Sequence, residues 1–552
     1  MRNPTACIFA ITLIFALGCG PGSSIDRTIE RIMGKPSGPS SSTAPAEDPY
    51  TLGYEIIEDL NVRDFAAARD KIDRLKTMRG RDDRWTQYAE AYLDYSVGQY
   101  DEALRILNAL NPGPHDTSYL DLRAYTYFSM NRLDDGRADM ETLLLADPAD
   151  ASHPLRALWN ISLEKGEFDK ARDYEGQLEA RPQLSADDML ATFDRALLEL
   201  DFDMASDALK RLPTLPSMLN NPGSEFYDPE ILLYRAKLAT AKGEIDRAVD
   251  ILKSMPQELP NVTANWPVLA WLGVTVGRYD DARLWAIEGA IRVGGEKNLA
   301  DLGIPIPESL RGVKPVGGPV RQDDLSSLLA CIGFTSLADG NPSEAVACAD
   351  EAFKVNRYNQ SALLLKSSAL KVEGDMPGAM KAAVDGMALA PYDSYIAMQY
   401  LSLAHTAPAA VESGFPDTEK VMSDELAKAK GYNELYPKHP PGLYVLGRLL
   451  ELAGDQNAGD YFRQAYETWP YSVDYAFSYA AWLAGAGDTA QAIEIIHRTG
   501  PPRDLPWLVE FYRRAAETGS EDLLDFANWL RTQMDPQNEW SQYIDPLAQT
   551  AE

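Results

Sequence analysis

The sequence predicts an all-α protein built as a solenoid of helix hairpins. Three observations support this fold class. A glycine-centred turn pattern recurs about every 34 residues, apolar residues follow a helical spacing before the turns, and prolines recur where the second helix of a pair should end. At roughly 150 residues per domain, the 552 residues would form three or four domains. Stacked repeats allow them to form one continuous array instead.

Charge and cysteine content exclude several classes of protein. Lys and Arg number 52 against 83 Asp and Glu, so the formal net charge is −31. Such an acidic chain lacks the basic surface that nucleic acids need, and any charged partner is expected to be basic. The four cysteines are too few for a disulfide-dense scaffold. Two of them lie near the N-terminus, which argues against an all-cysteine zinc site.

Residues 1–18 are predicted to be a signal peptide. A positively charged start precedes an apolar run over 6–18, which has the length of a signal peptide and is short for a membrane span. Residues 16–19, Ala-Leu-Gly-Cys, resemble a bacterial lipobox, with Leu17 two rather than three positions before the cysteine. The resemblance implies that Cys19 is acylated, becomes the mature N-terminus and anchors the chain in a membrane. A plain secretory signal that is cleaved nearby is the alternative.

Residues 19–49 are predicted to be a disordered tether. The segment is rich in Gly, Pro and Ser, a composition that does not build a packed core. About 30 residues of flexible chain typically reach about 30 Å from the membrane. By analogy with bacterial lipoproteins, Gly20 rather than Asp after the cysteine implies sorting to the outer membrane.

The turn pattern consists of Gly, a polar residue, an aromatic or aliphatic residue, two further residues and Ala. Most neighbouring copies lie 33 to 35 residues apart. Glycine ends one helix, an acidic residue favours the N-terminus of the next, and a small alanine lets the two helices approach. Clear copies begin at Gly98, Gly166, Gly243 and Gly277, and looser copies begin at Asn131, Asp201, Gly340, Gly374, Gly454 and Gly487.

The residues before each turn predict the first helix of each hairpin. Over 266–273 and over 443–450, apolar residues fall at i, i+3, i+4 and i+7 with a small residue among them, which is one helical face. The turn pattern, the apolar helical face before it and the 34-residue period resemble the tetratricopeptide repeat (TPR) family from about residue 50 to about 535. The resemblance implies a right-handed α-solenoid of roughly 11–13 TPR-like hairpins with an inner groove. An N-terminal array would occupy 50–293 and a C-terminal array 324–535.

Two stretches interrupt the period. From Gly277 to Gly340 is 63 residues, and the excess lies in 294–323, which is rich in Pro and Gly. A loop of that length is expected to be either functional or disordered. The second expansion is a lengthened turn near 406–416. Residues 536–552 are expected to form a C-terminal tail.

The sequence carries no recognisable catalytic motif, so we expect no enzyme activity, no cofactor and no metal site. The five histidines have no ligand spacing. Ser368 and Lys371 match the SxxK pattern of serine acyl-enzymes, but the companion motifs are missing, and we interpret the pair as one face of a helix. Cys331 and Cys348 fall in one predicted hairpin. We interpret them as buried free thiols, with a disulfide across the hairpin as the alternative.

The inner groove is where the TPR resemblance places binding, because four positions of each first helix face it in that family. Tyrosine and tryptophan there would combine apolar area with a polar tip and could hold a peptide. The same count puts Glu90 and Asp94 at normally apolar positions, so the alternative is that the aromatics pack between helices. The candidate groove residues are Trp85, Tyr88, Tyr92, Tyr95, Tyr125, Phe128, Arg156 and Asn160, followed by the more isolated Trp271, Phe334, Tyr444 and Arg448.

These patterns together predict a membrane-anchored scaffold that binds protein partners, with peptide segments held in the groove. The chain is similar to TPR lipoproteins that help assemble machinery of the bacterial cell envelope. That similarity implies an outer-membrane lipoprotein facing the periplasm or the cell surface. One alternative is a recruiter or regulator of an envelope enzyme or a polysaccharide export system. Another is a soluble secreted or intracellular adaptor.

Overall fold

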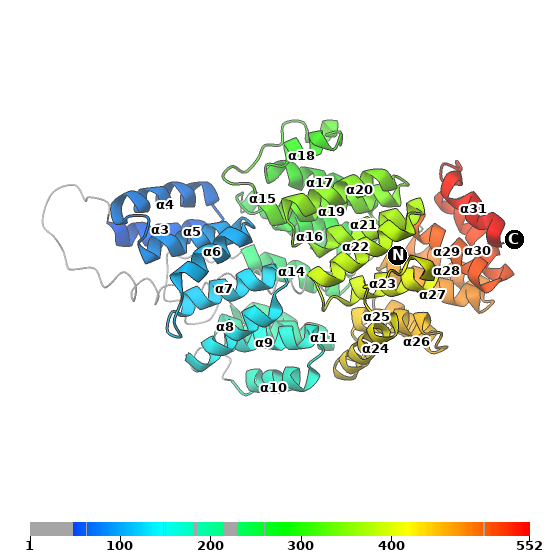
Figure 1. Ribbon diagram of the computed structural model, residues 1–552, viewed down its shortest axis with the longest axis horizontal. Coiled ribbons are helices and arrows are strands. Elements are labelled where there is room, and N and C mark those ends of the chain that lie inside the picture. Colours follow the sequence, from blue (N-terminus) through cyan, green and yellow to red (C-terminus); the bar gives the residue numbers. More distant parts are fainter. Residues whose placement is uncertain are drawn as a thin grey trace, which may run out of the picture.

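The computed structural model describes residues 48–61, 63–146, 148, 151–181, 185–212, 229–258, 260–500 and 503–551. These ranges hold 28 α-helices and two short 3-10 helices, and no strand occurs among them (Figure 1). The predicted signal peptide, Cys19 and almost all of the predicted tether lie outside the described residues.

Twenty-six of the 28 helices pair into thirteen hairpins, at the upper end of the expected 11–13. The prediction of an all-α array of helix hairpins is confirmed. In chain order the hairpins are α3 (Pro49–Asn61) with α4 (Phe65–Arg79), α5 (Arg84–Ser96) with α6 (Tyr100–Leu110), α7 (Thr117–Ser129) with α8 (Leu133–Ala146), α9 (Ser152–Glu164) with α10 (Phe168–Glu179), α11 (Ala186–Glu199) with α12 (Phe202–Arg211), α14 (Pro229–Ala241) with α15 (Ile245–Glu258), α16 (Asn265–Thr275) with α17 (Tyr279–Arg292), α19 (Gln322–Ala338) with α20 (Pro342–Val355), α21 (Gln360–Glu373) with α22 (Met376–Leu389), α23 (Ser394–Thr406) with α24 (Thr418–Leu435), α25 (Pro440–Leu452) with α26 (Ala458–Thr468), α27 (Val473–Gly485) with α28 (Thr489–Thr499), and α29 (Leu505–Thr518) with α30 (Glu521–Met534).

The recurring small residues are required at the contact between the two helices of a hairpin. The alanines of the turn pattern are completely buried. A Cβ atom on Gly273 would lie 2.9 Å from the Cβ of Ala282, so only glycine lets α16 approach α17 this closely. The fully buried alanines of the four clear copies are Ala103, Ala171, Ala248 and Ala282.

The turn that joins the two helices needs both a left-handed backbone and a favourable helix start. Gly98 has φ +81° and Gly277 has φ +75°, a conformation that glycine adopts without strain. Acidic residues then occupy the first turn of the second helix, where they suit the positive end of the helix dipole. In the looser copy at Asp201, the carboxylate itself caps α12 by accepting a hydrogen bond from the backbone N–H of Met204 at 2.9 Å.

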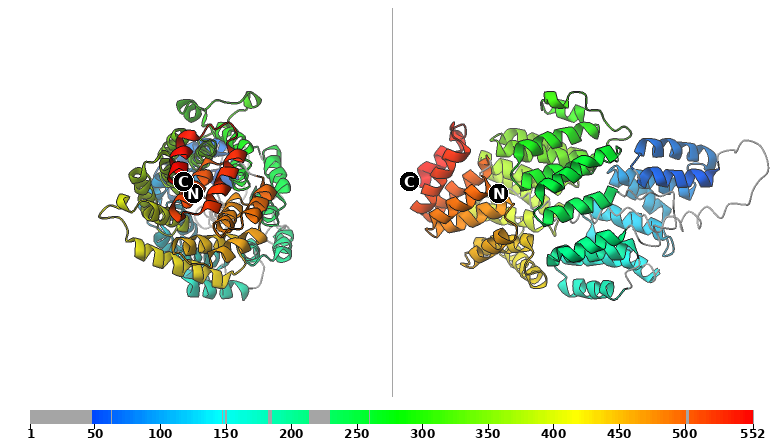
Figure 2. Two further views of the ribbon diagram at one scale, coloured as in Figure 1. Left: turned by 90° about the vertical axis from the view of Figure 1, so that its right-hand side faces the viewer. Right: turned by 180° about the vertical axis from the view of Figure 1, so that it is seen from behind.

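The array coils tightly, so that segments far apart in sequence lie side by side. Figure 1 shows the body elongated, with α3 to α6 at one end and α30 and α31 (Ser541–Ala551) at the other. In the end-on view of Figure 2 the helices surround the long axis. Direct hydrogen bonds join residues 201 to 258 positions apart, which is about six hairpins along the chain. Successive coils of the array are therefore in contact.

We call this line of contact between successive coils the seam. It joins the turn inside one hairpin to the connection that follows the fifth or sixth hairpin after it. Several glycines of the turn pattern lie directly on it. A Cβ atom on Gly243 would lie 2.2 Å from the ring of Tyr471, and one on Gly340 would lie 2.2 Å from Nε1 of Trp540. The hydrogen-bonded pairs of the seam include Arg63 with Arg321, Val97 with Gln322, Asp101 with Arg357 and Tyr358, Asn131 with Tyr358, Asp134 with Tyr392, Thr240 with Trp469, Tyr279 with Asp504, and Asp339 with Trp540.

The stretch 294–323 forms an ordered, packed connection between α17 and α19. It contains α18 (Glu296–Asp301) and the 3-10 helix η3 (Glu308–Leu310). Leu299 and Ile304 are buried in the main apolar core together with Leu310.

Arg321 connects the end of this stretch to the start of the array. Its guanidinium donates hydrogen bonds to Oγ1 of Thr263 at 2.9 Å and to the carbonyl oxygen of Arg63 at 3.1 Å. It also lies over the ring of Phe65, 4.8 Å from the ring centre. The connection therefore holds the first hairpin, α3 with α4, close to the start of α16.

The predicted tail is also partly helical. α31 lies within residues 536–552 and packs on α29. Trp540 and Ile544 are buried at its start, so the tail forms a cap on the last hairpin. Capping elements of this kind cover the apolar end that a repeat array would otherwise expose.

Candidate interaction site

The aromatic residues proposed for a peptide groove lie inside the protein. Trp85 and Tyr88 are completely buried, and Tyr92 is 4% exposed. Their rings pack on one another and on Tyr119, whose ring centre lies 4.7 Å from that of Tyr88. Tyr95 is half-buried. The four side chains form core between α4, α5, α6 and α7, which is the packing alternative, and they do not form an accessible shelf.

The candidates in the next hairpins are also packed rather than accessible. Tyr125 and Phe128 are buried against each other at 5.7 Å between ring centres. Arg156 is 4% exposed and donates two hydrogen bonds to Asp194, at 2.9 and 2.6 Å. Asn160 is half-buried. The more isolated Trp271, Phe334, Tyr444 and Arg448 are buried too.

A buried charge network links the first helices of the N-terminal hairpins. The imidazole of His153 on α9 lies 2.7 Å from a carboxylate oxygen of Asp121 on α7 and 3.6 Å from one of Asp187 on α11. Burial by itself would lower the pKa of His153, but the two carboxylates hold it well above its usual value. His153 is therefore cationic at neutral pH and joins three successive hairpins.

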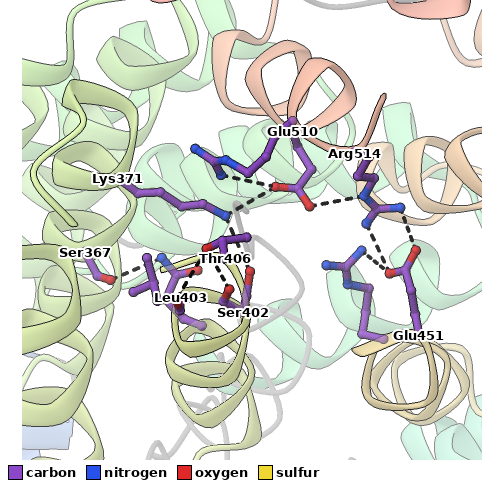
Figure 3. Close-up of polar contacts among 11 residues, drawn as sticks. Ser367, Lys371, Ser402, Leu403, Thr406, Glu451, Glu510 and Arg514 are labelled. Carbon is purple, nitrogen blue, oxygen red and sulfur yellow. Dashed lines mark hydrogen bonds and ion pairs between the residues drawn. The ribbon is translucent and has the colours of Figure 1, made fainter. Parts of the chain in front are cut away.

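A second network, which we call the inner cluster, joins first helices of the C-terminal hairpins (Figure 3). Nζ of Lys371 on α21 lies 3.3 Å from Oε2 of Glu510 on α29 and 3.4 Å from Oγ of Ser402 on α23. Arg514 donates a hydrogen bond to Glu510 at 3.1 Å and two to Glu451 of α25, at 2.6 and 3.1 Å. The remaining members are Arg448 and Arg513.

The inner cluster carries charge at neutral pH although it is buried. Burial would raise the pKa of Glu510, but Lys371, Arg514 and Arg513 hold it well below its usual value. Burial lowers the pKa of Lys371 to about 8, against the opposing effect of Glu510. Since Lys371 is engaged in this way, the SxxK pattern with Ser368 marks a packed helix face, as interpreted. The network fixes α23 and α25 relative to α29.

α23 and α25 also line an open hollow of about 660 Å³, which we call the α24 hollow. Its lining is mainly apolar, with Met422 and Leu426 of α24 facing Leu401 and Ala404 of α23 and Leu452 of α25. Met422, Leu426 and Leu452 are partly exposed. The other lining residues are His405, Thr418, Glu419, Ser423 and Ala453.

Two contacts explain why α24 stands away from its neighbours at this end. α24 begins only at Thr418, after a connection that contains the 3-10 helix η4 (Pro408–Ala410). Its C-terminal half is held against α10, where a Cβ atom on Gly431 would lie 2.4 Å from the ring of Phe168. Lys428 also donates a hydrogen bond to the carbonyl oxygen of Tyr392. The hollow is the space that remains between the N-terminal half of α24 and α23.

The two cysteines of the eighth hairpin, Cys331 and Cys348, are buried thiols, as interpreted. Burial raises the pKa of the Cys348 thiol to about 12, so the thiol is protonated at neutral pH. Across the described ranges, no cluster of three potential metal ligands occurs. No helix of the described part of the chain is long and apolar enough to cross a membrane.

No protein-family model matches the sequence, and no curated protein matches it. Solved helical-repeat structures are similar at low identity. The APC/C hetero-tetramer Cut9–Hcn1 aligns at 13% identity with a TM-score of 0.32, over 82% of this chain and 87% of the other. A tetratricopeptide repeat protein from Parabacteroides merdae ATCC 43184 aligns at 14% identity with a TM-score of 0.27, over 58% of this chain and 98% of the other.

The assignment of the fold therefore depends on the features of this chain. Thirteen hairpins recur with a period near 34 residues, with glycine at the turn and a buried alanine at the helix contact. By these features the chain is a TPR-like helical-repeat protein.

Proposed function

We propose that the protein is a lipid-anchored scaffold of a bacterial cell envelope whose helical-repeat array holds partner proteins. The observation that carries the anchor is the order of segments at the N-terminus. A charged start, a short apolar run and Cys19 precede a Gly-, Pro- and Ser-rich stretch, and the first described helix begins at Pro49. Helical-repeat arrays expose large surfaces on a rigid frame, which suits protein binding rather than catalysis.

Incorporation of labelled palmitate tests the anchor. The wild-type protein should be labelled, and Cys19→Ala should remove the label. Cys7→Ala is the matched control, because it alters a cysteine within the apolar run that precedes Cys19 and should keep the label. An unlabelled wild-type protein would refute the lipid anchor.

The proposed location is the outer membrane, with the array facing the periplasm. Density-gradient separation of inner and outer membranes should place the wild-type protein in the outer-membrane fraction. External protease should leave it intact in whole cells, whereas digestion of intact cells would place the array on the cell surface. Affinity capture from mildly solubilised envelopes with measured stoichiometry then tests the scaffold role. A near-stoichiometric partner is the expected result, and a reproducible absence of any partner would count against it.

A further inference from the structure

The α24 hollow combines an apolar floor with an acidic border. Buried Leu401 and Ala404 form part of the floor, and the half-exposed Met422 and Leu426 form its α24 side. Glu419 lines the opening. Clustered half-exposed apolar side chains around a concave site of this size are typical of places where another molecule inserts an apolar group.

The charge around the opening is negative. Two exposed carboxylates, Asp417 at the N-cap of α24 and Glu419 in its first turn, stand against exposed Lys420, and Glu419 lines the hollow itself. The chain as a whole has a net charge of −31. A basic segment is therefore attracted to this opening and an acidic one repelled.

The walls of the hollow are fixed by contacts with other helices. α23 and α25 contribute Ser402, Arg448 and Glu451 to the inner cluster, and α24 is held at Gly431 by Phe168. A site on helices that are fixed in this way needs little rearrangement to accept a ligand, which lowers the entropic cost of binding.

We propose that the α24 hollow is a docking site for a basic segment of a partner protein that inserts one apolar side chain. The apolar lining takes the side chain, and the acidic border takes flanking Lys or Arg residues. This inference rests on the proposal that the array holds protein partners, and it is independent of the lipid anchor.

A synthetic peptide serves as the probe. It is a capped, fluorescein-labelled nonapeptide with one central leucine flanked on each side by two basic residues, and fluorescence anisotropy measures its binding to the full-length protein in detergent. We expect saturable binding that weakens roughly tenfold when the leucine becomes serine. Replacing the basic residues with glutamates should abolish binding. Equal affinity for the leucine and serine peptides would overturn the proposal, because attraction to a negative surface alone gives that result.

Variants of the protein test whether the peptide binds in the hollow. Met422→Lys should weaken binding of the leucine peptide roughly tenfold or more, because it puts a cation in the path of a basic ligand. The matched control is Met78→Lys on α4, where Met78 is 41% exposed and far along the chain; it should leave the affinity unchanged. Should Met422→Lys lose helicity, Ser423→Trp occupies the hollow from an exposed position and should weaken binding equally.

Two further outcomes separate this inference from the scaffold proposal. If Met422→Lys and Ser423→Trp fold normally and still bind the peptide as the wild type does, the hollow is not the site. If partners captured from envelopes remain bound to these variants, the scaffold role stands while the docking site fails.

Discussion

Glycine at the turn of a hairpin serves two separate purposes, and alanine substitutions distinguish them. Gly340 and Gly374 occupy equivalent turns, with φ values of +89° and +86°. A Cβ atom on Gly340 would lie 2.2 Å from Nε1 of Trp540 on the seam, whereas one on Gly374 would meet nothing within 4 Å. Both glycines provide the left-handed backbone, but only Gly340 also allows a contact between coils.

The expected magnitudes follow from these two geometries. An alanine held at positive φ costs about 1 kcal/mol, so Gly374→Ala should lower the free energy of unfolding by about 1 kcal/mol. Gly340→Ala carries the same cost and must also displace Trp540, which is 2% exposed and donates a hydrogen bond to the carbonyl oxygen of Asp339 at 3.2 Å. Overpacking of this kind adds about 1–3 kcal/mol. We expect a total loss of about 3 kcal/mol for Gly340→Ala.

Urea unfolding followed by far-ultraviolet circular dichroism measures both losses. Repeating the Gly340→Ala measurement in a Trp540→Ala background completes a double-mutant cycle, because the clash partner is then absent. In that background Gly340→Ala should cost only about 1 kcal/mol, as Gly374→Ala does. Equal losses for the two glycine variants in the wild-type background, or an unchanged loss after Trp540→Ala, would refute the seam contact.

Three further predictions concern buried groups. Burial, aided by the charge of Lys237, lowers the pKa of His439 from 6.5 to about 3. Below pH 6.5 the native state therefore binds fewer protons than the unfolded state, and the free energy of unfolding decreases as the pH falls. By pH 4.5 this loss reaches about 3 kcal/mol, and His439→Asn should remove it from the pH profile of thermal unfolding. Glu510→Gln leaves buried cations without their carboxylate and should cost about 3–5 kcal/mol in urea unfolding, whereas Glu494→Gln at an exposed pair should cost under about 1 kcal/mol. Iodoacetamide at pH 8 should label Cys348 only after unfolding, and mass mapping that finds it labelled in the folded protein would contradict its burial.

The hairpins could be predicted from the sequence because their causes are local. A glycine with positive φ, a buried alanine five residues later and a helical apolar face all fall within one 34-residue unit, as at Gly98 and Ala103. The periodic signal survives variation because each unit repeats the same packing problem. The helix in the predicted tail was missed because its apolar residues are few and Pro546 interrupts them.

The coiling could not be predicted in the same way, because it depends on small rotations that accumulate over many hairpins. Asp101 and Tyr358 are 257 residues apart, and no local pattern relates them. Counting positions from the turn placed Trp85 and Tyr88 in an accessible groove, whereas they are completely buried. The sequence did carry a warning, since the same count placed Asp94 at an apolar position. Asp94 is buried, and its burial raises the pKa of its carboxyl to about 6.

The candidate site was visible in the sequence only as an irregular spacing. The lengthened turn near 406–416 predicted an expanded repeat, but the direction of α24 depends on Gly431 meeting Phe168 of a distant hairpin. Likewise, Lys371 was recognised as part of a helix face, but its partner Glu510 lies 139 residues away. Sites assembled by contacts between coils require the three-dimensional structure.

The seam also restricts how this chain can change in length. Open repeat arrays tolerate the gain or loss of whole repeats, because each repeat contacts only its neighbours. Here an added hairpin between Gly243 and Tyr471 would shift the pairing of these two residues by one unit, and every seam pair that spans the insertion would be shifted with it. Additions are compatible with the seam where they project from it, as the helix α18 does at the edge of the body in Figure 1. The number of repeats is thus fixed by the closure of the coil, and length variation is expected in the connections.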